Sequence, residues 1–129
     1  MNGYLLDTST ALWMTSAPER VSRRQRAAIE AGPVWLSVIS FWEVTIKTAG
    51  KRLELAEPKR WWRIAIDDLQ AGVLALRPEH VAALIPLPPL HHDPFDRMLL
   101  AQAAAEDLSL LSSDRAMQAY ATAGCRIIA

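Results

Sequence analysis

The chain has 129 residues, of which 51% are hydrophobic and 22% are charged, and its formal net charge is zero. This composition excludes a disordered chain, and zero net charge gives no overall attraction to nucleic acid or to a membrane. Its length suits one domain, so we expect residues 1–129 to fold as a single unit. The N-terminus lacks a signal-peptide pattern and no apolar run approaches the roughly 20 residues of a membrane span, so we expect a cytoplasmic protein.

Strand-like and helix-like patterns alternate, which is typical of a parallel sheet between helices. In chain order we expect strand 3–6, helix 9–14, helix 22–31, strand 34–38, helix 40–49, helix 58–71, strand 73–76, helix 79–85, helix 94–106, strand 109–112, helix 115–121 and strand 126–128. Segment 86–92 is rich in proline, which lacks a backbone donor, and is therefore expected to be a loop. The sequence predicts an α/β fold with a central parallel sheet of about five strands flanked by helices.

Four carboxylates lie where such a fold places its ligands. Asp7 directly follows strand 3–6 and Asp114 follows strand 109–112, while Glu43 and Asp96 lie near the starts of expected helices. Ligands of open parallel sheets bind at the carboxyl ends of the strands, so we expect the four side chains to gather there. A hard divalent cation bound through oxygen would relieve their repulsion. The pattern therefore predicts an Mg²⁺ or Mn²⁺ site.

Three of these acids, Asp7, Glu43 and Asp114, also have a simpler local role. Asp7 suits a turn or a helix N-cap, and Asp114 suits an N-cap that would complete the site through water. Ser40 and Glu43 match the capping-box pattern S-x-x-E, which by itself would explain Glu43. Asp93 precedes a proline, a strong N-cap signature, so we assign it chiefly to capping and assign Asp96 to the metal.

Other motifs are less specific. Segment 20–63 holds ten basic and four acidic residues, which suits a polyanionic substrate and equally suits solvated helix surfaces. The three histidines lack zinc-ligand spacing, and His91 and His92 are expected to be solvent-exposed in their loop. Cys125, the only cysteine, is expected in the core. Most tryptophans are also expected there, and the exposed member of the pair Trp61-Trp62 is a candidate for partner contact.

The chain resembles the PIN-domain ribonucleases and, within them, the VapC-type toxins of bacterial toxin–antitoxin pairs. Four segments in order carry the resemblance, and it spans essentially the whole chain. The most specific is the pattern D-P-F-D-R-x-L-x-A-Q-A that begins at Asp93. The segments are 4–9 (YLLDTS), 37–43 (SVISFWE), 93–103 (DPFDRMLLAQA) and 110–114 (LLSSD).

The resemblance implies a PIN-like fold and an Mg²⁺- or Mn²⁺-dependent endoribonuclease. It matches Asp7, Glu43 and Asp96 to the three principal acidic ligands and Asp114 to a more variable fourth. Thr8 and either Ser112 or Ser113 match the supporting hydroxyl positions. The resemblance further implies RNA as substrate, a homodimer, and inhibition by a VapB-type antitoxin. Segment 60–68 is one surface where that antitoxin could dock.

Two other functions compete with this interpretation. A phosphatase related to the haloacid dehalogenases also begins with an acid after its first strand, but its D-x-D pattern fails here because Ser9 replaces the second acid. A PIN-like scaffold could bind RNA or protein without cutting. Such degenerate members normally lose acids, whereas this chain keeps all four.

Overall fold

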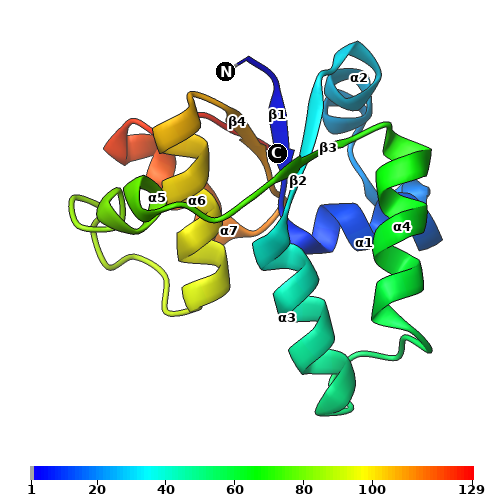
Figure 1. Ribbon diagram of the computed structural model, residues 1–129. Coiled ribbons are helices and arrows are strands. Elements are labelled where there is room, and N and C mark those ends of the chain that lie inside the picture. The colour runs from blue at the N-terminus through cyan, green and yellow to red at the C-terminus, as the bar shows by residue number, and fades with distance from the viewer. Residues whose placement is uncertain (1) are drawn as a thin grey trace.

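The protein is described by a computed structural model that covers residues 2–129 and is built around one parallel sheet of five strands (Figure 1). Every neighbouring pair of strands is parallel, and the strand order is β3-β2-β1-β4-β5. The strands are β1 (Tyr4–Leu6), β2 (Val34–Ser37), β3 (Gly72–Leu74), β4 (Ser109–Leu111) and β5 (Ile127–Ile128). This arrangement confirms the predicted fold class.

Helices cover both faces of the sheet. They are α1 (Thr8–Ser16), α2 (Arg23–Ala31), α3 (Val38–Ala49), α4 (Pro58–Leu69), α5 (Pro78–Ala82), α6 (Pro94–Glu106) and α7 (Arg115–Gln118), with 3₁₀ turns at Pro18–Arg20 and Ala119–Ala123. Figure 1 shows α5, α6 and α7 on one side, and α1, α2 and α4 on the other. None of the helices described over residues 2–129 is long and apolar enough to cross a membrane.

The two faces of the sheet carry separate apolar cores. Leu5 and Leu110 pack with residues of α6 and α7, whereas their neighbours Leu6 and Leu111 pack with residues of α1 and α4. This division follows from the strand geometry, because successive side chains point to opposite faces. Cys125 was expected in the core; it is half-buried and packs against the edge of the first core.

The strand order places a topological switch point beside β1. From β1 the chain moves outward to β2 and β3, and later crosses to β4 and β5 on the other side. Open α/β sheets bind ligands in the crevice at such a point, outside the carboxyl ends of the strands. Asp7 directly follows β1 at this point, and Ser112 directly follows β4.

Helix α3 begins earlier than expected, and this corrects one local prediction. Ser37 is its N-cap and accepts a hydrogen bond from the Ile39 N–H at 3.0 Å, so Val38 is helical instead of ending the strand. The capping box predicted for Ser40 and Glu43 is therefore wrong. Because Ser37 already caps the helix, Glu43 lies in its second turn and is free for another role.

The tryptophans also differ from expectation. Trp61 is buried, and Trp62 is half-buried and stacks on Phe41 with ring centroids 5.0 Å apart. The most exposed tryptophan is instead Trp42, on α3, which packs edge-on against Phe95. The pair Trp61-Trp62 therefore has no freely exposed member, although Ile64 on the same helix is exposed.

Candidate functional site

Asp7 is a buried acid at the end of β1. It caps α1 by accepting a hydrogen bond from the Thr10 N–H at 2.8 Å, which confirms the capping role, and only 4% of the residue is exposed. Burial raises the pKa of Asp7, and the charge of Asp114 raises it further, while hydrogen bonds from Ser112 and Thr10 partly oppose the rise. Ser112, which hydrogen-bonds to Asp7, is fully buried, whereas Ser113 is exposed.

Glu43 projects from α3 and is also only 4% exposed. The Thr8 hydroxyl donates a 2.7 Å hydrogen bond to its Oε1, and Lys47, one turn later, forms an ion pair with its Oε2. Burial of Lys47 opposes its charged form, but the hydrogen bond and charge of Glu43 prevail and raise the pKa of Lys47. Both oxygens of this buried carboxylate are therefore held in place.

Asp96 lies in the first turn of α6. Asp93 caps that helix by accepting from the Phe95 N–H at 2.9 Å, as predicted. Burial raises the pKa of Asp96 to about 7, and the negative charges of Asp93, Glu43 and Asp7 add to the rise. The charges of two other predicted ligands, Glu43 and Asp7, therefore act on Asp96, although these residues are far from it in the sequence.

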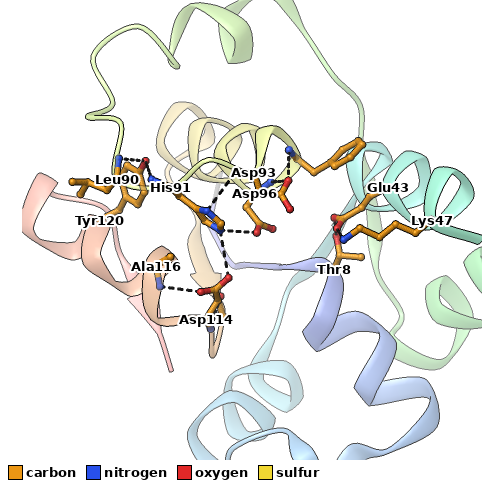
Figure 2. A network of polar contacts seen from close by, with 12 residues as sticks. Thr8, Glu43, Lys47, Leu90, His91, Asp93, Asp96, Asp114, Ala116 and Tyr120 are labelled. Atoms are coloured by element: carbon orange, nitrogen blue, oxygen red, sulfur yellow. Dashed lines mark hydrogen bonds and ion pairs between the residues drawn. The ribbon is translucent and has the colours of Figure 1, made fainter. Parts of the chain in front are cut away.

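His91 joins Asp96 to the fourth acid. Its Nε2 lies 2.9 Å from Oδ2 of Asp96 and 3.4 Å from Oδ2 of Asp114 (Figure 2). Asp114 caps α7 by accepting from the Ala116 N–H at 2.9 Å, and its side chain is the most exposed of the four acids at 43%. The ligand atoms of His91, Asp96 and Asp114 are mutually close enough to surround one ion.

The four predicted acids therefore gather at one edge of the sheet. Electrostatic coupling links Asp96 to Asp7 and Glu43, and links Asp7 to Asp114. Carboxylates that are close and partly desolvated favour the protonated form unless a cation balances them, which explains the raised pKa values of Asp7 and Asp96. Oxygen donors of this kind are what Mg²⁺ and Mn²⁺ prefer. The residues present fit a divalent cation.

A comparison with protein families decides the assignment. The family model described as "PIN domain" matches residues 4–123, which is nearly the whole chain. The chain belongs to the PIN domain family.

Individual relatives agree with this family. The PIN domain is 28% identical over 122 residues to "Ribonuclease VapC22" of Mycobacterium tuberculosis (strain ATCC 25618 / H37Rv), covering 93% of each chain. Among solved structures, it resembles a chain of VapBC2 from Rickettsia felis bound to a promoter DNA fragment, with a TM-score of 0.73, 12% identity and coverage of 99% and 98%. A chain of DNA-bound VapBC from Salmonella typhimurium gives a TM-score of 0.71 at 18% identity, with the same coverage.

Sequence reasoning missed two members of this site in the PIN domain, His91 and Lys47. The expectation of solvent-exposed loop histidines holds for His92 but is wrong for His91, whose side chain is only 16% exposed. A signal was present, because His91 stands two residues before the N-cap of α6 and so must lie at the same sheet edge as Asp96. Lys47 follows Glu43 at i+4, the spacing of a helical ion pair.

Proposed function

We propose that this PIN domain is a metal-dependent endoribonuclease toxin, neutralised by a cognate VapB-type antitoxin. The observation that carries the proposal is the convergence of Asp7, Glu43 and Asp96 in a largely buried cluster at the switch point, with Asp114 at its rim. The similarity to a relative named as a VapC ribonuclease supports the same activity. We also propose that residues 1–129 form one PIN-like domain and that it acts in the cytoplasm, where its RNA substrate would be found.

Asp7, Glu43 and Asp96 would hold one or two Mg²⁺ or Mn²⁺ ions, and Asp114 would contribute directly or through water. Such a bound cation supplies an activated water molecule and stabilises negative charge on the attacked phosphate. The protein's part is to hold the ligands. Thr8 fixes one oxygen of Glu43 and Ser112 hydrogen-bonds to Asp7. In this scheme no serine, lysine or histidine acts as the nucleophile.

The RNA backbone would lie along the basic part of the chain. Most cations of segment 20–63 are exposed. Those on α2 and α4 lie at the surface and do not pair with the acidic cluster. Lys47 is the exception, because it is half-buried and bound to Glu43. The exposed cations of these two helices are Arg23, Arg24, Arg26, Lys59, Arg60 and Arg63.

A groove between the end of α1 and the start of α4 suits the antitoxin. It has a volume of about 330 Å³, and Arg60, Trp61 and Ile64 of the segment proposed from the sequence line one side of it. Its lining is largely apolar, with Arg60 and Glu57 as its two charged residues, and it would accept a partner segment that carries apolar anchors. We further propose that the toxin is a homodimer, and sedimentation of the purified protein would test this.

Substitution Asp96→Asn tests the proposed activity. It removes the charge of one proposed ligand at nearly constant size, so we expect Mn²⁺ binding to the metal-stripped protein to be lost in calorimetry while the fold persists. Cleavage of RNA should disappear with it. Asp68→Asn, at an exposed position of α4, is the matched control and should bind Mn²⁺ like the wild type.

Retained RNA cleavage by Asp96→Asn would contradict the proposal. Metal-independent RNA binding that survives replacement of Asp7, without any cleavage, would instead favour the non-catalytic scaffold.

A further inference from the structure

His91 enters the acidic site from a loop that is fixed from behind. Tyr120, which is fully buried, accepts hydrogen bonds from the N–H groups of Leu90 at 3.1 Å and His91 at 3.2 Å. Its hydroxyl donates to the carbonyl of Pro88 at 2.7 Å. One side chain thereby satisfies three backbone groups of the loop that precedes α6. The backbone of His91 is therefore anchored to the core through Tyr120.

The contact made by the second ring nitrogen of His91 favours one tautomer. The backbone N–H of Asp93 donates to Nδ1 of His91 at 3.4 Å, so Nδ1 offers a lone pair. A neutral ring whose Nδ1 accepts must carry its proton on Nε2. This Nε2 is the atom that lies 2.9 Å from Asp96 and 3.4 Å from Asp114 (Figure 2). The ring therefore presents an N–H donor to the two carboxylates.

That tautomer is unsuited to binding a metal. A histidine that binds through Nε2 needs its lone pair there, and its Nδ1–H then usually donates to a carbonyl or carboxylate. Here Nδ1 faces the Asp93 N–H, which is itself a donor, so the metal-binding tautomer would set two N–H groups against each other. His91, Asp96 and Asp114 are close enough to surround an ion. The hydrogen bonds of His91 nevertheless favour a role as a hydrogen-bond donor over a role as a metal ligand.

We propose that His91 is a positioning residue of the acidic site, which uses its Nε2–H to hold Oδ2 of Asp96, and more weakly Asp114, without binding the cation itself. The inference rests on the proposed function insofar as these two acids are metal ligands. It adds that the orientation of Asp96 depends on His91, and that Tyr120 sets His91 in place. The remaining oxygen of Asp96 is left for the cation.

Nitrogen NMR of the metal-free protein, labelled with ¹⁵N in the histidine rings, tests the tautomer directly. We expect His91 to show the Nε2–H pattern, and to keep it after saturation with Mg²⁺. His92, which is exposed, supplies an unconstrained reference in the same spectrum. An Nδ1–H pattern in the metal-free protein, or a change to that pattern on adding Mg²⁺, would overturn the proposal in favour of His91 as a ligand.

Calorimetric titration of Mn²⁺ tests the positioning role. Loss of an outer partner of a metal ligand typically weakens metal binding 10- to 100-fold, so we expect His91→Leu to weaken Mn²⁺ binding by about tenfold or more. His91→Gln should recover most of this loss, because its amide N–H can take the place of Nε2–H. His92→Leu should match the wild type. Tyr120→Phe, which touches none of the acids, should weaken Mn²⁺ binding in the same direction while remaining folded.

Wild-type affinity in His91→Leu would refute the positioning role while leaving the proposed metal site intact. A His91→Gln variant as weak as His91→Leu would likewise count against it, because the imidazole itself would then be required. Absence of Mn²⁺ binding in the wild type would refute the proposed function, and the positioning role with it.

Discussion

At the scale of single residues, the site consists of acids whose carboxylates are restrained by hydrogen bonds and an ion pair within the protein. Glu43 is held by Thr8 and Lys47, and Asp7 by Thr10 and Ser112. Restraint of this kind lowers the entropic cost of assembling a binding site, because the ligands need not be ordered when the ion arrives. The same contacts satisfy carboxylates that would otherwise be buried without partners.

Thr8→Val tests both effects. The variant keeps the shape of the side chain but removes the hydroxyl that donates to Glu43. A hydrogen bond to a charged group contributes about 1.5–3 kcal/mol, so we expect the free energy of unfolding to fall by about that amount and Mn²⁺ binding to weaken. Urea denaturation and calorimetry would measure the two changes. Thr8→Ser keeps the hydroxyl and should stay close to the wild type; equal losses in both variants would argue against the hydrogen bond as the cause.

The raised pKa of Asp96 makes a second prediction, for the metal-free protein. Its folded pKa of about 7 lies above the ordinary aspartate value of 3.8, so the folded state holds the proton more tightly than the unfolded chain does. The stability that this provides is complete below the unfolded pKa and is lost as pH rises through about 7. Urea denaturation at about pH 5 and about pH 8 should therefore show a larger loss of stability for the wild type than for Asp96→Asn. Equal losses in the two proteins would contradict the assignment.

At the scale of elements, the starts of two helices bring the acids into the site. Ser37 caps α3 and donates a 2.5 Å hydrogen bond to Oε1 of Gln102 on α6, and all of these polar groups are buried. The N-terminal half of α3, which carries Glu43, is thereby tied to α6, which carries Asp96. Strand β2 feeds directly into α3, so the placement of Glu43 also depends on how β2 packs against its neighbours.

Gly72→Ala should disturb that packing. Gly72 pairs with Trp35 across β2 and β3, and an added Cβ would lie 2.6 Å from the indole ring. Overpacking of this kind typically costs about 1–3 kcal/mol, which thermal or urea unfolding would detect. Gly50→Ala is the control, because its Cβ would meet its nearest neighbour at 3.5 Å and its φ of −82° suits alanine. We expect no loss of stability in Gly50→Ala. Comparable losses at both positions would show that overpacking against Trp35 is not the cause of the loss in Gly72→Ala.

At the scale of the whole molecule, folding gathers negative charge that the unfolded chain keeps apart. Asp7, Glu43, Asp96 and Asp114 are spread over most of the sequence, yet the switch point of the sheet brings them to one edge. The fold therefore carries an electrostatic cost at its site, and a bound cation would offset it. Metal binding and folding stability should accordingly be linked.

A thermal melt with increasing Mn²⁺ tests this linkage. A ligand that binds only the folded state stabilises it by about 2.7 kcal/mol when present at 100 times its dissociation constant, so the melting temperature of the wild type should rise with Mn²⁺. A chelator should reverse the rise, and Asp96→Asn should show little of it. A wild-type melting temperature that does not respond to Mn²⁺ would mean that the acids do not form a metal site.

Much of the fold was predictable from the sequence, because its signals are local. The apolar strand cores, the proline before α4 and the Asp93-Pro94 start of α6 depend on neighbouring residues, and the predicted bounds of α6 match the structure. Chain positions of the acids relative to strand ends likewise predicted that they would gather. The predicted start of α3 was wrong because Ser37 and Ser40 are both plausible caps. In the structure Ser37 is the cap, and it also makes a long-range hydrogen bond to Gln102 that the local sequence does not reveal.

The sequence by itself thus determined the α/β class and the four acids, because strand, helix and cap preferences act over a few residues. The tertiary structure decided which other side chains join those acids. His91 lies beside Asp114 because Tyr120 fixes the loop that carries His91, and because the strand order places the end of β4 next to the end of β1. Contacts of this kind link residues far apart in the chain, where their energy depends on packing and burial and not on local sequence pattern.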